Sequence, residues 1–237
     1  MAFTVITSWD FRGADSASVK RASRRGSYTL IQQGTPTYAT TGVTCDTASA
    51  GLNLVLPSEL KFTGDFWLMC RARRSASGAV SSTVFGYIPN DSDSTPFLTL
   101  AHVQMASGTN AKIAGSDNGT YVESAESTTA VPQSSFETYT LKSLGTSIKL
   151  FSEAVERYSV TVASRPAFYA TSHFSLGAVI NSTRDHKLEY EWAIIGTGDI
   201  TTGEMSTIAA SPNTYIYGAA TTPFRAYGRY GVRGPVR

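Results

Sequence analysis

The chain has 237 residues, of which 41% are hydrophobic, and its 20 basic and 18 acidic side chains give a net charge of +2. This length and hydrophobic content suffice for one domain with a sizeable core, whereas so small a net charge gives no argument for nucleic-acid binding. The charged fraction, 16%, is low. Ser, Thr and Gly fill the difference, which favours many short strands joined by turns.

The first ten residues contain no basic segment followed by a long apolar run, so we expect no secretory signal. No stretch of the sequence has the length and hydrophobicity of a membrane span, so we expect no membrane insertion. Without secretion, the two cysteines, Cys45 and Cys70, are expected to be buried free thiols and not a disulfide. We interpret the protein as one made inside the cell.

After a first strand near residues 3–7, a basic cluster is formed by Lys20, Arg21, Arg24 and Arg25. A charge run of this kind is either a solvated loop or a surface that docks on an acidic partner. Both interpretations are kept, and the four residues are candidate partner-binding residues. Short strands are expected near 28–31 and 43–45, and an alternating strand at 52–56.

The next strand, which begins at Phe66, has two distinct faces. One face is apolar and is expected to face the core; it carries Phe66, Leu68, Cys70 and Ala72. The opposite face carries Trp67 and Met69, followed by Arg71 and Arg73. The two apolar residues of this second face either pack under a loop or arm, or line a ligand-binding surface. Packing is the favoured interpretation.

A polar loop holds Asp91 and Asp93, which are weak candidates for a calcium site. The loop lacks the Gly and Glu of an EF-hand, so an ordinary Asx-rich turn is favoured. Farther along, Asn118-Gly119 is a strong signal for a tight hairpin. We therefore expect no metal and no cofactor.

Strands follow near 138–141, 148–151, 158–162 and 174–177, and then the central strand 188–195. Its bulky apolar residues recur every second position, which predicts that all four face the core: Leu188, Tyr190, Trp192 and Ile194. Thr201 and Glu204 have the spacing of a capping box, which predicts one short helix near 201–209, with Met205 and Ile208 on one side.

The order of these segments resembles a known family. Three parts of the sequence resemble, in this order, segments of the laminin-G-like or concanavalin A-like jelly roll. They are Phe62-Thr-Gly64-Asp65-Phe66, then Tyr139-Thr-Leu141 with the strand 147–151, and then Ile200-Thr201 with Glu204-Met205. The resemblance covers roughly residues 5–210. It implies an all-β fold, a two-sheet antiparallel jelly-roll sandwich, formed by one domain over residues 1–212.

The remaining segment, 213–237, changes in composition. It has no carboxylate, and arginines recur at every fourth position among Tyr, Gly and Pro. The glycines and Pro235 make a helix unfavourable, so we expect an extended basic and aromatic arm that docks on a neighbouring subunit. Its candidate partner-binding residues are Arg225, Tyr227, Arg229, Tyr230, Arg233 and Arg237.

A catalytic site is sought first at Glu189 and Glu191, because carboxylates two apart on a strand share a face, and jelly-roll glycosidases place their acid and nucleophile in this way. The third carboxylate of that pattern is missing, since Ala193 stands there. We therefore interpret both as surface glutamates. The three histidines are scattered, without metal-ligand spacing, so we expect no enzyme.

Two binding functions remain. A freestanding jelly roll with basic arms resembles the accessory proteins of bacteriophage particles. It implies a non-enzymatic virion structural protein, a capsid decoration or tail protein, assembled in the host cytoplasm as a homo-oligomer that docks on capsid or tail subunits. The alternative is a lectin-like module that recognises glycans on a host surface. The fold alone cannot choose between them.

Overall fold

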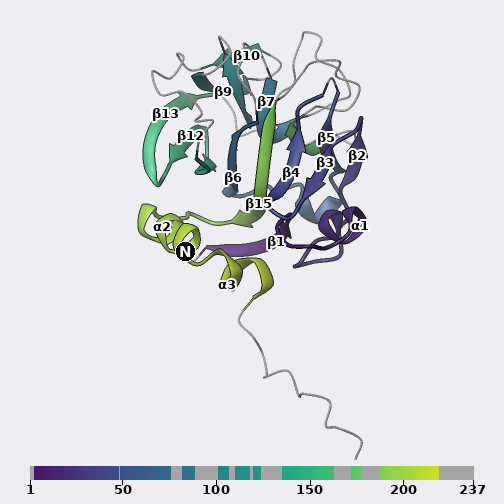
Figure 1. Cartoon of the computed structure of the whole chain (residues 1–237). Coiled ribbons are helices and arrows are strands. Elements are labelled where there is room, and N and C mark those ends of the chain that lie inside the picture. Colours follow the sequence, from purple (N-terminus) through teal and green to yellow (C-terminus); the bar gives the residue numbers. More distant parts are fainter. Residues whose placement is uncertain are drawn as a thin grey trace, which may run out of the picture.

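The computed structural model describes residues 3–47, 49–75, 82–88, 101–106, 110–117, 120–123, 135–162, 172–177 and 187–218. These residues form two antiparallel sheets that pack face to face (Figure 1). The expected all-β sandwich is therefore confirmed. No helix in the described part of the chain is long and apolar enough to cross a membrane.

The first sheet has eight strands. Along the sheet they follow the order β13 (Val155–Thr161), β12 (Ser147–Ser152), β11 (Glu137–Leu144), β6 (Phe66–Arg74), β15 (Leu188–Thr197), β4 (Gly42–Cys45) and β3 (Thr37–Ala39), and β1 (Thr4–Asp10) also pairs with β15. Because β15 is ten residues long, β4 pairs with its first three residues and β1 with its later part.

The second sheet has seven strands among the described residues. Their order is β10 (Thr120–Glu123), β9 (Asn110–Asp117), β8 (Ala101–Ala106), β7 (Ser82–Ile88), β14 (His173–Gly177), β5 (Gly51–Val55) and β2 (Ile31–Gln33). The pairing of Asp117 with Thr120 confirms the hairpin that was predicted from the Asn-Gly signal.

The main core lies between the sheets. Its aromatic centre includes Trp9, whose ring stacks on Phe174 at a centroid distance of 5.6 Å. Cys45 and Cys70 are both buried there as free thiols, as expected. Burial raises the pKa of the Cys45 thiol to about 12, so this thiol stays protonated and unreactive at neutral pH.

The central strand β15 contains a β-bulge that the sequence pattern did not predict. Tyr190 lies opposite Ala72 and Trp192 lies opposite Arg71, so Glu191 is an extra residue without a partner in β6. A bulge of one residue reverses the alternation of faces beyond it. Leu188 and Tyr190 therefore face the main core as predicted, but the prediction was wrong for Trp192 and Ile194, which face outward.

The outward side chains form a second buried cluster on the outer face of the eight-stranded sheet. Helices α2 (Thr202–Ala210) and α3 (Pro212–Tyr217) cover this part of the sheet (Figure 1). The cluster consists of Trp67, Met69, Phe151, Trp192, Ile194, Ile200, Met205, Ile208 and Ile216. Trp67 and Met69 thus pack under helices, which confirms the favoured interpretation.

The close approach of Trp67 to the backbone explains a glycine in β15. A Cβ atom on Gly196 would lie only 2.1 Å from the Trp67 ring and 2.5 Å from the Thr4 carbonyl oxygen, so no larger residue fits at this position without moving both the ring and the backbone of β1. The Trp67 indole N–H then donates a hydrogen bond to the Thr197 carbonyl, 3.3 Å away.

The predicted capping box begins α2. The Thr201 hydroxyl accepts a hydrogen bond from the Glu204 N–H (3.3 Å), and the Glu204 carboxylate accepts one from the Thr201 N–H (2.7 Å). The expectation of a single helix was wrong, because α1 (Ala17–Arg21), the 3₁₀ turn η1 (Ser58–Leu60) and α3 are also present. Each has six residues or fewer, too short for a helical period to show in the sequence.

The domain extends beyond its predicted end at residue 212. In α3, Ile216 is buried, and its carbonyl accepts a hydrogen bond from the Ser8 hydroxyl at 2.7 Å. The Tyr217 hydroxyl donates to the Asp10 carboxylate at 2.8 Å. Residues 213–218 therefore belong to the folded domain and not to an extended arm. The arm residues Arg225, Tyr227, Arg229, Tyr230, Arg233 and Arg237 lie outside the described residues, so their docking role stays a prediction.

Replacing Trp192 by Ala should lower the free energy of unfolding by about 3 to 5 kcal/mol, because a fully buried indole leaves a cavity between β15 and α2. Denaturant unfolding measures this change. The control is Val55→Ala, at a position that is 48% exposed, which should change stability by about 0.5 kcal/mol or less. A loss below about 1 kcal/mol for Trp192→Ala would contradict the second cluster.

The contribution of α3 can be measured by comparing a chain that ends at Gly218 with one that ends at Ser211. The shorter chain loses the burial of Ile216 and the hydrogen bonds to Ser8 and Asp10. Its free energy of unfolding should be lower by about 2 to 4 kcal/mol. Equal stabilities of the two chains would show that α3 is not part of the domain.

Candidate binding site

Beyond the helices, the outer face of the eight-stranded sheet becomes charged. Strand β6 continues from Met69 to Arg71 and Arg73, and each arginine faces a glutamate of β15. The Arg71 Nε lies 2.8 Å from the Glu191 carboxylate, and an Arg73 nitrogen lies 2.7 Å from that of Glu189. The two glutamates were expected at the surface, but the Glu189 side chain is only 8% exposed. It is stabilised there by its ion pair and by a hydrogen bond from the Thr41 hydroxyl.

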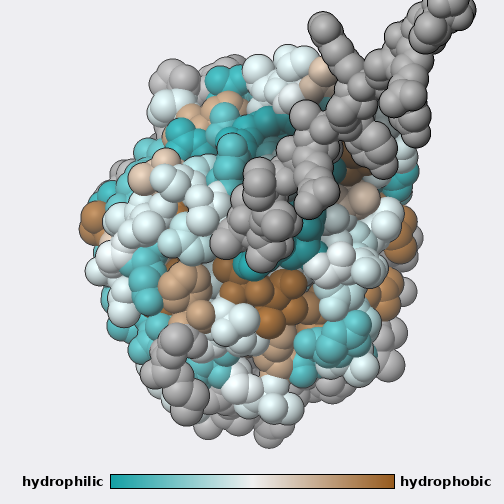
Figure 2. All heavy atoms as spheres, turned by 90° about the horizontal axis from the view of Figure 1, so that it is seen from below, coloured by the Kyte–Doolittle hydropathy of each residue, from teal (hydrophilic) through white to brown (hydrophobic). Residues whose placement is uncertain are grey.

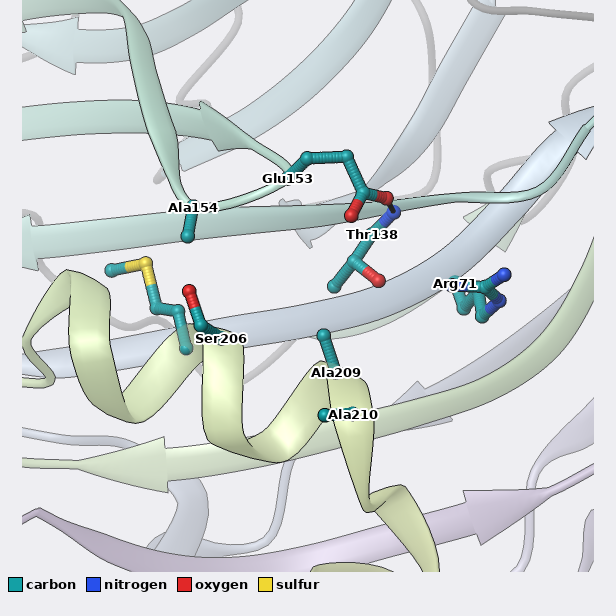
Figure 3. A pocket seen from close by; sticks show the side chains of 8 residues that line it. Arg71, Thr138, Glu153, Ala154, Ser206, Ala209 and Ala210 are labelled. Atoms are coloured by element: carbon teal, nitrogen blue, oxygen red, sulfur yellow. Dashed lines mark hydrogen bonds between the residues drawn. The ribbon is translucent and has the colours of Figure 1, made fainter.

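A pocket of about 280 Å³ opens where this charged surface meets α2 (Figure 3). One wall comes from α2 and is small and mostly apolar, and the opposite wall comes from β6, β11 and the turn between β12 and β13. The lining residues are Arg71, Thr138, Glu153, Ala154, Met205, Ser206, Ala209 and Ala210. The pocket therefore combines an alanine-rich wall with a guanidinium, a hydroxyl and a carboxylate.

Thr138 is the most informative residue of this pocket. It lies directly opposite Arg71 in the sheet and is 1% exposed. Its hydroxyl has no hydrogen-bond partner among the described residues. A buried hydroxyl without a partner costs about 1 to 3 kcal/mol, and native proteins leave few such groups. Of the buried side-chain atoms without a partner among the described residues, the Thr138 hydroxyl is the one that belongs to a residue lining this pocket.

The side chain of Glu153 lines the same pocket, and a strained turn between β12 and β13 positions it there. Ser152 pairs with Val155, so Glu153 and Ala154 form a two-residue hairpin with φ angles of +50° and +60°. Such turns favour Asn and Gly, and residues held with positive φ often mark functional sites. The conformation lets the Glu153 carboxylate accept a hydrogen bond from the Thr138 N–H at 2.6 Å.

Sequence reasoning missed most of this site. Arg71 was assigned correctly to the outer face, but Thr138 resembles any other strand residue. Glu153-Ala154 lacks the residues that usually announce a tight turn. The contact of α2 with the sheet, which closes the pocket, depends on the bulge in β15.

The predicted basic cluster is not one surface. Lys20 is 1% exposed, and its ammonium donates hydrogen bonds to the Phe11 carbonyl (2.5 Å) and to the Ala39 carbonyl. Burial lowers the pKa of this ammonium. The prediction that Lys20 binds a partner was therefore wrong, because the residue stabilises the packing of α1 on its neighbours.

The three arginines of that cluster are partly exposed. Arg21 donates to the Leu30 carbonyl at 3.2 Å, and Arg24 lies 2.7 Å from the Asp15 carboxylate. Arg25 borders a second hollow of about 360 Å³, whose other walls are Phe3, Thr4, Val5, Thr214 and Tyr215. These arginines thus hold internal contacts or line a mainly apolar wall, and their docking role stays a prediction.

Figure 2 looks at the end of the molecule that carries β1, α2 and α3 and shows hydrophobic residues gathered in one patch bordered by polar ones. The second hollow is formed by residues of β1 and α3 together with Phe3 and Arg25. Arg25 is the one charged residue in its lining, and Thr4 and Thr214 are the two threonines there.

The predicted weak metal ligands, Asp91 and Asp93, lie outside the described residues. Within the described part of the chain, no group of three or more His, Cys, Asp or Glu side chains could hold a metal ion. The expectation that this loop is an ordinary turn without a metal stays a prediction.

No family model matches the sequence, and no curated protein matches it significantly. Solved structures do match. The binding domain of botulinum neurotoxin serotype G aligns with a TM-score of 0.65 at 12% identity, over 89% of this chain and 52% of the toxin chain. The fold is the concanavalin A-like jelly roll. The jelly-roll part of the sequence-based resemblance is thus confirmed, whereas the bacteriophage part gains no support.

Two further matches come with bound sugars. The ligand-binding domain of botulinum neurotoxin serotype D, in complex with N-acetylneuraminic acid, has a TM-score of 0.64 at 10% identity over 87% of this chain. Trypanosoma rangeli sialidase in complex with 2,3-difluoro-KDN has a TM-score of 0.64 at 9% identity over 89% of this chain. The chain spans about half of each toxin chain and 33% of the sialidase chain. Identities this low show the fold alone.

Replacing Thr138 by Val removes the unpartnered hydroxyl and keeps the shape of the side chain. The free energy of unfolding should stay the same or rise by about 1 kcal/mol, because no internal hydrogen bond is lost. Ser143→Ala is the matched control, since Ser143 carries another buried hydroxyl without a partner on the same strand. A loss above about 1 kcal/mol for Thr138→Val alone would reveal an internal partner and remove the argument for a ligand.

Proposed function

We propose that this protein binds carbohydrate, without catalysis, in the pocket between α2 and strands β6 and β11. The serotype D toxin domain of the same fold is in complex with N-acetylneuraminic acid, and botulinum neurotoxin type C depends upon interaction with two ganglioside molecules to enter cells. This chain matches only half of those toxin chains, so the match does not place a sugar on the shared half. The proposal therefore depends on the pocket itself.

The observation that carries the proposal is the buried Thr138 hydroxyl, which has no partner among the described residues. A sugar ring presents several hydroxyls, each of which can donate and accept a hydrogen bond, and it also presents apolar C–H groups. The pocket matches both properties. Arg71 supplies donors, Glu153 supplies an acceptor, and Thr138 supplies both. The wall formed by Ala209 and its α2 neighbours offers an apolar surface. Pockets that combine apolar walls with a few converging polar groups are the usual form of small-molecule sites.

The other sequence-based expectations are kept as proposals. No particular contact in the described residues supports a location in a bacteriophage virion. The same holds for capsid or tail subunits as partners and for self-association. The absence of catalysis is proposed because Glu189 and Glu191, the carboxylates first considered for catalysis, are each held by an arginine.

A glycan array tests the proposal with the wild-type protein and two variants of α2. Ala209→Trp places an indole in the pocket without removing a polar group, and Thr207→Trp places it at an exposed position of the same helix that does not line the pocket. The wild type and Thr207→Trp should bind the same glycans. Ala209→Trp should lose at least about 90% of the signal, because the pocket is filled.

The absence of any glycan signal from the wild type would contradict carbohydrate binding. Equal signals from all three proteins would show that the glycan binds elsewhere on the molecule. Thermal unfolding of each variant checks that Ala209→Trp remains folded.

A further inference from the structure

Three arginines near the pocket are already neutralised by carboxylates. The Arg71 guanidinium lies 2.8 Å from Glu191, and a second arginine of β6 is paired with Glu189. The next arginine toward α3 is paired as well: Arg12 lies 2.9 Å from the Asp10 carboxylate. None of these guanidiniums is a free positive charge that could hold an anionic ligand.

Glu153 differs from these carboxylates. Its carboxylate makes no ion pair among the described residues, and the one hydrogen bond that this carboxylate accepts there comes from the neutral N–H of Thr138. The side chain lines the pocket from the turn between β12 and β13, with its carboxylate beside the Thr138 N–H (Figure 3). With Arg71 balanced by Glu191, the charge of Glu153 leaves the pocket with a net negative charge.

From this arrangement we infer that the pocket takes an uncharged sugar and rejects acidic sugars such as sialic and uronic acids. The inference rests on the proposed function and adds the ligand class. A sugar carboxylate in the pocket would lie near the Glu153 carboxylate, and the described lining residues include no cation other than Arg71, which Glu191 already neutralises. Two like charges a few ångströms apart near a protein surface repel strongly enough to lower affinity by about tenfold or more. The hydroxyls of an uncharged sugar, by contrast, find an acceptor in Glu153 and donors in Arg71 and Thr138.

This selectivity differs from the ligand seen in the serotype D toxin domain, which is the acidic sugar N-acetylneuraminic acid. The shared fold therefore does not imply a shared ligand, because the charges of the pocket decide the ligand class.

The test uses an array on which each neutral oligosaccharide stands beside its sialylated and its glucuronidated counterpart. The full-length protein should bind neutral members at least about tenfold more strongly than their acidic counterparts. Glu153→Gln keeps an acceptor for the Thr138 N–H but removes the charge, so it should reduce this ratio several-fold. The matched control is Glu156→Gln on β13, which removes a carboxylate paired with Lys149 outside the pocket and should leave the ratio unchanged.

Acidic glycans that bind as well as neutral ones, and that lose binding in Ala209→Trp, would overturn this inference and leave the proposed function standing. An unchanged ratio in Glu153→Gln would also overturn it. If no glycan of either class binds, the proposed function itself is wrong.

Discussion

The bulge at Glu191 is the feature on which the outer face of the eight-stranded sheet depends. It puts two consecutive residues of β15 on the same side, with Glu191 beside Arg71 and Trp192 beneath α2. The extra residue is not left without backbone partners, because its carbonyl accepts a hydrogen bond from the Phe11 N–H at 2.9 Å. Bulges next to functional sites commonly redirect a side chain in this way.

One consequence is that a single sheet face has two regions with different chemistry. Trp67, Met69 and Trp192 provide an apolar half that needs a cover, and Met205 and Ile208 of α2 provide it. The other half carries paired charges that remain partly in contact with water. The pocket lies at their boundary, because the helix ends there and its last residues are alanines. A wall of larger side chains would have closed the pocket against Thr138.

The sequence was sufficient to predict the fold class because alternation in several strands, the Thr201–Glu204 capping box and the order of the segments all indicated the same sandwich. It was not sufficient for the site. The bulge at Glu191 arises from the pairing of its strand with a neighbouring strand. The alternation of residues within one strand gives no information about that pairing. Lys20 looked like a surface charge because sequence does not show that two backbone carbonyls surround its ammonium. The hydroxyl of Thr138 could be recognised as unpartnered only in three dimensions.

The most direct test of this account is a methyl NMR titration of the full-length protein with the neutral glycan that gives the strongest array signal. The methyl resonances of Thr138, Ala154 and Ala209 should shift together and saturate with one dissociation constant, because these residues surround one pocket. Those of Ala50 and Ala193, which are fully buried in the main core, should stay unchanged. Saturable shifts confined to other parts of the molecule, with these three methyl groups unaffected, would contradict the account.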